Sequence, residues 1–314
     1  MQLFLSLIYD EAQMGPLVNQ HKLLRTVANY PVLGQVLEQM RPLWEPSNTE
    51  VILVGNTHLD QIKAWVRQQY PKLNAHFVEA AEGQSWLWAA RDKIGDGPLV
   101  LAKAESIVLA DFAELAGLTG VEAAVLVSDK HETSRWGMVQ VDSDNHVTAL
   151  AESGRAWAGI LWLASGARLR EGLSETTQMG DVIGRLLGQK HPIVAGTVHH
   201  WLDVATREDL LRVNNRLLAI GYNSQDALER SYTEEFAVIP PVFIHESAEI
   251  IASVIGPYAS IGAGAVVEGC VVQNSIFEAG AQVRHAVLDG AYIGHKAEHT
   301  SKPLGLVVDG ESGK

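Results

Sequence analysis

The sequence predicts an α/β domain with a Rossmann-like, doubly wound and mostly parallel sheet, followed by a short parallel β-helix. Three observations predict this architecture. Short apolar runs alternate with longer stretches over the first two thirds of the chain, and apolar residues recur in those stretches at three- and four-residue spacing. A six-residue apolar period then replaces both patterns. The first two are typical of buried strands separated by helices, and the third is typical of a solenoid.

The apolar runs that we expect to form strands are short and bounded by polar or glycine-containing segments. They cover residues 3–8, 51–55, 75–80, 98–102, 123–128, 136–142 and 158–164. The stretches "YPVLGQVLEQM" and "HLDQIKAWVRQQY" lie between the early runs and have the apolar spacing of helices. In sheets of this kind ligands bind at the carboxyl ends of the strands, so the site is expected there.

After "SYTEEFAVIPP" large apolar residues recur about every six positions, which is the period of a parallel β-helix. The predicted inward anchors are Ile244, Ile250, Ile255, Ile261, Val267, Val271, Phe277, Val283, Val287 and Ile293. We therefore expect an α/β domain over residues 1–232, a linker over 233–240, and a β-helix with a C-terminal tail over 241–314. A lone short solenoid buries little core, so we expect a homo-oligomer formed through the β-helix.

The composition is that of a globular protein, with 47% hydrophobic and 19% charged residues. A net charge of −13 argues against nucleic acid as a partner, because nucleic-acid binding needs a basic surface. No apolar run reaches the length of a membrane span, and the first residues lack a basic leader, so we expect a cytoplasmic protein without a membrane partner. The single cysteine, Cys270, excludes an internal disulfide and is interpreted as a packed residue.

Several stretches carry a family resemblance through their order and spacing. They are "HKLLRTVANYPVLGQVLEQM", "VILVGNTHLDQIKAWV", "SRWGMVQVDSDNHVTALAES", "WAGILWLAS", "MGDVIGRLL" and "HHWLDVATREDLLRVNNRLL". Together with the β-helix they resemble the sugar-1-phosphate nucleotidyltransferases (NDP-sugar pyrophosphorylases) that carry a left-handed β-helix behind a Rossmann-like catalytic domain. Members of this family join a nucleoside triphosphate to a sugar phosphate with loss of pyrophosphate. The resemblance implies Mg²⁺ as the cofactor, and a sugar phosphate or nucleotide-sugar as the partner.

The segment "SLIYDEAQMGPL" departs from the family's phosphate loop, which is of the type G-x-G-T-R. Tyr9 and Glu11 stand at the two glycine positions, and Gln13 stands at the position of the catalytic arginine. Bulky or acidic side chains obstruct the close backbone approach that glycine gives to a phosphate, and glutamine brings no charge. Lys22 matches the catalytic lysine of the family's lysine-proline segment.

The resemblance also places a nucleotide-base site at "EGQSWLWAA", where the family has a G-T-A segment. Gln84 and Ser85 are the matching nucleotide-binding positions. Trp86 follows them, and its wide indole is expected to fill the base pocket. Trp86 and Trp88 can instead stack on a ligand, but packing within the domain is the favoured interpretation.

The metal positions implied by the resemblance are Glu105, where the family has an aspartate, and Asp203 in "WLDVAT". Two carboxylates near strand ends can hold Mg²⁺ when phosphates supply the remaining ligands. The neighbouring Lys103 can instead pair with Glu105, which leaves metal binding open.

The sugar-binding positions implied by the resemblance lie in the middle of the domain. They are Glu152, Gly137 and Gly159.

These matches favour a nucleotidyltransferase-like protein that is non-catalytic or weakly catalytic and serves as a regulatory, scaffold or sugar-phosphate-binding protein. The alternative is an active Mg²⁺-dependent enzyme that makes an NDP-sugar from a nucleoside triphosphate and a sugar 1-phosphate. A third hypothesis, acyl transfer by the β-helix with His285 or His295 as base, is disfavoured because the helix is short. Zinc binding by His199 and His200 is disfavoured because no cysteine accompanies them.

Overall fold

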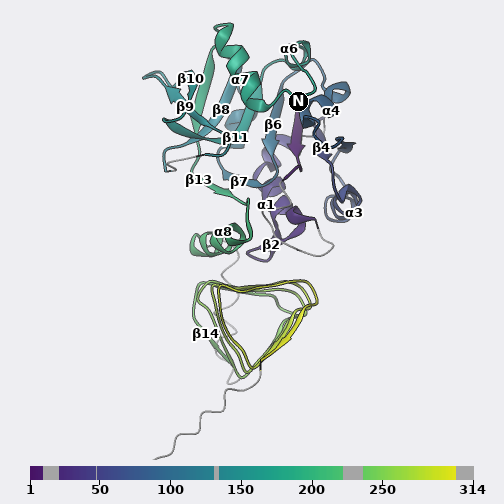
Figure 1. Ribbon diagram of the computed structural model, residues 1–314, viewed down its shortest axis with the longest axis vertical. Helices are drawn as coiled ribbons and strands as arrows, with labels where there is room; N and C mark the ends of the chain where they lie inside the picture. Colours follow the sequence, from purple (N-terminus) through teal and green to yellow (C-terminus); the bar gives the residue numbers. More distant parts are fainter. Residues whose placement is uncertain (10–20, 47, 131–133, 222–235, 302–314) are drawn as a thin grey trace, which may run out of the picture. The chain divides into compact units, whose positions relative to one another are not determined.

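The computed structural model describes residues 1–9, 21–46, 48–130, 134–221 and 236–301. The chain divides into two compact units, which are described separately (Figure 1). Unit 1 comprises Met1–Arg25 and Pro31–Arg207, and unit 2 comprises Thr26–Tyr30 and Glu208–Lys314. No helix among the described residues has the length and apolarity that crossing a membrane requires.

Unit 1 is built on a mixed sheet whose strands include all seven runs predicted from the sequence. The strands are β1 (Gln2–Ser6), β4 (Glu50–Gly55), β5 (Ala75–Glu79), β6 (Leu99–Lys103), β8 (Ala123–Ser128), β9 (Met138–Val141), β10 (Val147–Ala151), β11 (Arg155–Leu163) and β12 (Ile193–Thr197). In the described part of unit 1 these nine strands follow the order β10-β9-β11-β6-β1-β4-β5, with β8 paired to β11 and to β12. Strands β5, β4, β1 and β6 are parallel, whereas β11 runs antiparallel to β6, β8 and β9.

Helices connect these strands, and a second, small sheet lies beside the main one. The helices of unit 1 are α1 (Val32–Gln39), α2 (Arg41–Trp44), α3 (Leu59–Gln69), α4 (Trp86–Ala89), α5 (Phe112–Ala116), α6 (Gly166–Glu171) and α7 (Met179–Gly188), with 3-10 turns η2 (Lys22–Leu24) and η3 (Arg91–Lys93). The small sheet pairs β7 (Ser106–Leu109) with β13 (His200–Asp203). Strands β1, β4 and β6 are buried along most of their length, as expected for a sheet covered on both faces.

The apolar spacing of the helix segments explains how they cover the sheet. In α3, Leu59, Ile62 and Val66 are buried at three- and four-residue spacing. Helix α7 begins with a reciprocal capping box between Gln178 and Asp181, which satisfies amide groups that have no partner within the helix. The α/β prediction for this part of the chain is confirmed.

Unit 2 contains a stack of short strands that coil as a triangle in Figure 1. Its strands are β14 (Phe236–Val238), β15 (Val242–Ile244), β16 (Glu249–Ile251), β17 (Ser253–Ile255), β18 (Ala259–Ile261), β19 (Val266–Glu268), β20 (Val271–Gln273), β21 (Ile276–Phe277), β22 (Gln282–Arg284), β23 (Val287–Asp289), β24 (Tyr292–Ile293) and β25 (Glu298–Thr300). Within the described residues they form three parallel four-stranded sheets, β14-β17-β20-β23, β15-β18-β21-β24 and β16-β19-β22-β25. This arrangement fits the predicted short left-handed β-helix, and β14 lies within the range predicted as a linker.

Two of the ten predicted inward anchors are wrong. Val271 and Val287 are 44% and 81% exposed, while the following residues, Val272 and Leu288, face the interior. Successive side chains of a strand point to opposite faces, so a shift of one residue exchanges inside and outside. The coil does not keep a strict six-residue step at these corners.

Helix α8 (Arg207–Ala219) belongs mainly to unit 2, as does most of the hairpin of β2 (Thr26–Val27) and β3 (Tyr30–Pro31). The buried Asn214 of α8 accepts hydrogen bonds from the Ala28 amide (3.0 Å) and the Ser260 hydroxyl (2.6 Å), and donates to the Tyr258 carbonyl (3.3 Å). One amide side chain thus joins helix, hairpin and β-helix inside unit 2. Domain boundaries at residues 232 and 241 stay a prediction.

Candidate functional site

The candidate site lies at the carboxyl ends of the central strands of unit 1. Strands β1 and β6 are parallel neighbours in which Ser6 pairs with Lys103, and Lys103 Nζ lies 3.4 Å from Ser6 Oγ. The chain then turns at Glu105 and enters β7, where Ser106 pairs with Asp203 of β13. The topology therefore brings the two predicted metal carboxylates to one place, although they are far apart in sequence.

Both carboxylates are held by cationic side chains. Lys22 Nζ lies 2.8 Å from Glu105 Oε2 and donates to the Ala205 carbonyl at 3.1 Å. Arg135 lies between the carboxylates: its Nη2 is 2.8 Å from Glu105 Oε1, and its Nε is 2.6 Å from Asp203 Oδ2. The Lys22 and Glu105 side chains are 2% and 4% exposed, so this pair is almost completely removed from water. The result is a charged cluster of Lys22, Glu105, Arg135 and Asp203.

A buried hydroxyl and two indoles support the cluster. Ser106 Oγ donates to Asp203 Oδ1 (3.1 Å) and accepts from the indole nitrogens of Trp136 (3.2 Å) and Trp201 (3.3 Å). Gly159 leaves room for the Trp136 ring, since a Cβ at Gly159 would lie 2.9 Å from it and the φ of 73° also favours glycine. Trp136 is therefore fixed beneath the charged groups.

Two cations pack against the Trp136 ring. The guanidinium carbon of Arg135 lies 4.2 Å from its centre and Lys103 Nζ lies 5.2 Å from it; Lys103 Nζ is also 5.6 Å from the centre of the Trp86 ring. Burial lowers the pKa of Lys103 to about 8, with Glu105 opposing the shift and Arg135 adding to it. The prediction that Lys103 pairs with Glu105 is not met, because the ion pairs of Glu105 are made by Lys22 and Arg135.

Burial also raises the pKa of Asp203, and the hydrogen bond and charge of Arg135 oppose that shift. Without the guanidinium, only the hydrogen bond from Ser106 among these groups would oppose the effect of burial on Asp203. Arg135 therefore stabilises the ionised carboxylate.

Tyr9 and His21 border the cluster at Lys22. The Tyr9 hydroxyl accepts from the Lys22 amide (3.3 Å), and the Tyr9 ring meets the His21 ring edge-on at 5.0 Å. His21 Nδ1 accepts from the Leu23 amide (3.1 Å), which requires an unprotonated Nδ1. Burial, with the charges of His58 and Lys22, lowers the pKa of His21 to about 4. The predicted positions Glu11 and Gln13 lie outside the described residues.

The predicted base-site residues shape the beginning of α4. Ser85 caps this helix by accepting from the Leu87 amide (3.2 Å), and its hydroxyl donates to the Thr177 carbonyl. Gln84 accepts from the amide of Ala81 at 3.3 Å. The Trp86 indole is 2% exposed and belongs to the hydrophobic core, in agreement with the packing interpretation.

The predicted sugar-binding residues lie near the start of β9, where Ala151 of β10 and Ala156 of β11 both pair with Met138. Glu152 is exposed in the turn between β10 and β11, whereas Gly137 and Gly159 lie next to and beneath Trp136. Sequence reasoning missed Arg135, Ser106 and Trp136 as members of the site. The dipeptide Arg135–Trp136 was the available signal, because a cation beside an aromatic ring at a strand entry can serve as a stacked anion-binding group.

The cluster does not fit a Mg²⁺ ion between the two carboxylates in this arrangement. Mg²⁺ needs oxygen ligands at about 2.0–2.1 Å with octahedral geometry. Here the oxygens of Glu105 and Asp203 already contact Lys22, Arg135 and Ser106. Among the described residues, no group of three or more histidine, cysteine, aspartate or glutamate side chains is placed to hold a metal.

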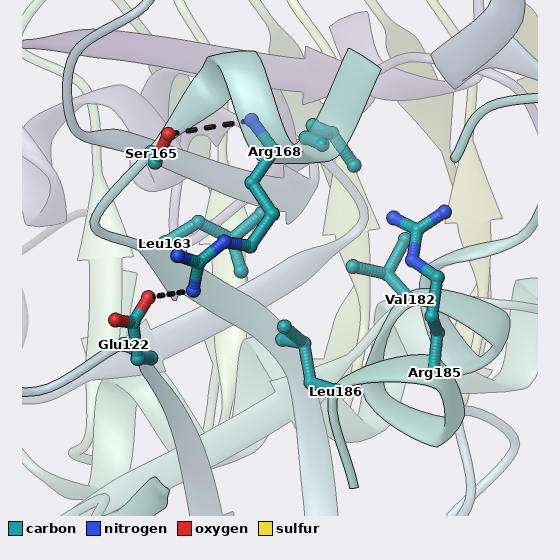
Figure 2. Close-up of a pocket in the computed structure, with 8 residues that line it drawn as sticks. Glu122, Leu163, Ser165, Arg168, Val182, Arg185 and Leu186 are labelled. Atoms are coloured by element: carbon teal, nitrogen blue, oxygen red, sulfur yellow. Dashed lines mark hydrogen bonds and ion pairs between the residues drawn. The ribbon is translucent and has the colours of Figure 1, made fainter. Parts of the chain in front are cut away.

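Two pockets of unit 1 lie away from the cluster residues. Figure 2 shows a small one of about 10 Å³, where Arg168 turns to Glu122 and Arg185 reaches in from α7. A larger pocket of about 410 Å³ is lined by α5, β8 and β12. Its lining includes Asp111, Glu114 and Asp144, which repel an anionic phosphate.

Comparison with known proteins identifies the fold. No family model and no curated protein matches the sequence. Among solved structures, the chain is similar to a Bacillus anthracis protein assigned as a glucose-1-phosphate thymidylyltransferase and solved in complex with sucrose. The TM-score is 0.60 at 15% sequence identity, and the match covers 71% of this chain and 95% of that chain. Over the matched part, this chain therefore shares the fold of that protein.

Proposed function

We propose that this protein binds a sugar phosphate or nucleotide-sugar at the carboxyl edge of the unit 1 sheet, and that it transfers nucleotides weakly or not at all. Such a protein would serve as a regulatory or scaffold member among nucleotidyltransferase-like folds. The fold supports the ligand class, since a similar structure was assigned as an enzyme of sugar 1-phosphates. The ion pairs of the cluster support the expectation that nucleotidyl transfer is weak or absent.

One observation carries the proposal: three cations face two carboxylates at the place where this fold binds its ligands. Lys22, Arg135 and Lys103 outnumber Glu105 and Asp203, and Arg135 remains 32% exposed. A local excess of positive charge in a partly buried place favours an anion, even in a chain whose net charge is −13. A phosphate monoester is an anion of suitable size and charge.

Nucleotidyl transfer requires more than an anion site. The reaction needs backbone amides and cations on a triphosphate, with metal ions neutralising the charge that develops. The loop of Tyr9, Glu11 and Gln13 offers side chains where the family has glycines and an arginine. Glu105 and Asp203 are also committed to protein cations. The loop that would bind the triphosphate and the carboxylates that would hold the metal ion are therefore both less suited to nucleotidyl transfer.

The convergence of Glu105 and Asp203 favours a second candidate, an active Mg²⁺-dependent nucleotidyltransferase. In that case Arg135 would have to leave the carboxylates when metal and triphosphate arrive. Release of pyrophosphate from a nucleoside triphosphate and glucose 1-phosphate, in the presence of Mg²⁺, would support this candidate over the first.

Calorimetric titration of the full chain with glucose 1-phosphate, without divalent metal, tests the first candidate. We expect binding, and we expect the Lys103→Met variant to bind at least tenfold more weakly. Lys130→Met is the matched control, because Lys130 is exposed and donates to the His199 carbonyl. No heat of binding with sugar phosphates or nucleotide-sugars would refute the proposal.

We also propose that the protein self-associates through the outer face of β14-β17-β20-β23. Ala237, Val254, Val271 and Val287 pair across these strands and form one aliphatic row. Val271 and Val287 are 44% and 81% exposed. A second copy of the chain would cover this row, as symmetric oligomers commonly do.

A further inference from the structure

We propose that Arg135 is a built-in cation that takes the place of a divalent metal between Glu105 and Asp203. The inference rests on the proposed function, because it states how the same site neutralises the phosphate of its ligand. The site would then bind a phosphate without a metal ion, and removal of the guanidinium would create a metal site that the native chain lacks.

The contacts of Arg135 resemble those of a bridging ion more than those of a surface ion pair. Its Nε and Nη2 grip Asp203 as a fork, at 2.6 Å to Oδ2 and 2.9 Å to Oδ1. The same Nη2 reaches Glu105 Oε1 at 2.8 Å. A planar guanidinium is suited to such two-pronged binding, and it stays protonated at every relevant pH.

All four carboxylate oxygens have donors. Arg135 supplies three of these contacts, Lys22 covers Glu105 Oε2 at 2.8 Å, and Ser106 adds a second contact to Asp203 Oδ1 at 3.1 Å. A divalent ion could enter only by displacing Arg135 and leaving this charge in a partly buried place. The carboxylates would lose their contacts with the guanidinium and form contacts with the metal ion instead. Because the two sets of contacts offset each other, we expect the native chain to have little affinity for a divalent metal.

The surroundings hold Arg135 in position. Its guanidinium stacks on the Trp136 ring at 4.2 Å, and that ring is fixed by the hydrogen bond to Ser106 and by the space above Gly159. Stacking on an indole stabilises a cation most where water is partly excluded. The bridging position is thus built into the fold.

Arg135 also keeps groups available for a ligand. Among the described residues, no ion pair or hydrogen bond of its Nη1 is found, and the side chain is 32% exposed. Lys103 packs on the same indole, 5.2 Å from its centre. An anionic phosphate that contacts both Arg135 and Lys103 would relieve the repulsion between these two cations. Arg135 therefore serves two purposes, neutralising the carboxylates and binding the phosphate.

The test measures Mn²⁺ binding to the full chain by the loss of the free-ion electron paramagnetic resonance signal. We expect the native protein to bind Mn²⁺ weakly and Arg135→Gln to bind it at least tenfold more tightly. Adding Asp203→Asn to Arg135→Gln should abolish the gain. Arg155→Gln is the matched control, since Arg155 pairs with Asp129 outside the cluster and should leave Mn²⁺ binding at the native level.

A second readout uses inorganic phosphate as the probe. The native protein should bind phosphate without metal, Arg135→Gln should lose this binding, and Mn²⁺ should restore it in the variant. Arg135→Lys keeps the charge, so it should still exclude Mn²⁺; this variant tests the inference even if Arg135→Gln does not fold. Tight Mn²⁺ binding by the native chain that Asp203→Asn abolishes would overturn the inference, as would Arg135→Gln that folds without gaining Mn²⁺. Failure of sugar phosphates to bind, with the Mn²⁺ results as expected, would refute only the proposed function.

Discussion

In the described part of each unit one glutamate is buried, and the contacts of the two carboxylates differ. Glu105 in unit 1 and Glu278 in unit 2 are both 3% exposed. Glu105 is held by the cations Lys22 and Arg135, whereas Glu278 accepts from the Tyr292 hydroxyl and, at 2.7 Å, from the His295 amide. Neutral donors thus contact Glu278 in the β-helix, while cations contact Glu105 in the charged cluster. Both carboxylates are equally buried, so burial alone does not distinguish them. A buried carboxylate marks a candidate site when the donors around it are charged.

Replacing Glu105 by glutamine should produce the largest effect on stability. Glu105→Gln leaves the buried Lys22 without its carboxylate and removes one of the two carboxylates that contact Arg135, so we expect unit 1 to lose about 3 kcal/mol of unfolding free energy. All eight tryptophans lie in the residues of unit 1, so tryptophan fluorescence during urea unfolding reports this unit alone. Glu122→Gln, at a more exposed ion pair, is the control and should cost less than 1 kcal/mol. Equal losses at the two positions would contradict the role given to the cluster.

The second largest effect on the stability of unit 1 should come from lowering the pH, through protonation of His21. Its folded pKa is about 4 against an unfolded value of 6.5, so the unfolded chain takes up the proton first as pH falls. The contribution of neutral His21 to the unfolding free energy is fully present above pH 6.5. It is lost progressively as the pH falls from there toward 4, by about 2 kcal/mol at pH 5. In His21→Asn, which keeps an acceptor for the Leu23 amide, the loss between pH 7.5 and pH 5 should be smaller by that amount. Unfolding curves of both proteins at the two pH values make the measurement.

The same glutamine substitution in the β-helix should cost less. In Glu278→Gln the remaining side-chain oxygen can still accept from the Tyr292 hydroxyl or the His295 amide, so we expect a loss of about 1 kcal/mol. Hydrogen exchange of the β21 and β24 amides measures the effect, and the tryptophan transition of unit 1 should stay unchanged. A loss as large as that of Glu105→Gln would remove the distinction between the two carboxylates.

The smallest effect on folding is expected at Val287, which is 81% exposed. Val287→Asp should change the unfolding free energy by less than about 0.5 kcal/mol, as surface substitutions usually do. It should nevertheless separate the proposed oligomer into monomers in light scattering at tens of micromolar. Thr300→Asp adds the same charge at an exposed residue of β25 and should leave the oligomer intact. Native protein that is monomeric under these conditions would contradict self-association.

The two units also differ in how far the sequence predicts them. The apolar period predicted the β-helix because each inward residue, such as Ile261 or Val267, repeats one physical requirement. It failed at Val271 and Val287, where the coil shortens its step and a shift of one residue turns a side chain outward. Local patterns thus predict repeated structure well and its irregular corners poorly.

In unit 1 the family resemblance pointed to Lys22, Glu105 and Asp203, which the structure does bring together. It did not predict Arg135, because the sequence does not show which cation meets which carboxylate across β7, β13 and the residues before β9. Placement of Arg135 depends on tertiary packing against Trp136, and periodicity carries no information about it. The candidate site was therefore predicted in its residue types but not in its electrostatics.

The most direct test of the built-in cation is anomalous diffraction from crystals of the native protein soaked in Mn²⁺. A built-in cation predicts no anomalous peak between Glu105 and Asp203, with the Arg135 guanidinium in contact with both, and a peak at that place in crystals of Arg135→Gln. A Mn²⁺ peak bound by both carboxylates in the native protein, with Arg135 displaced from them, would contradict it.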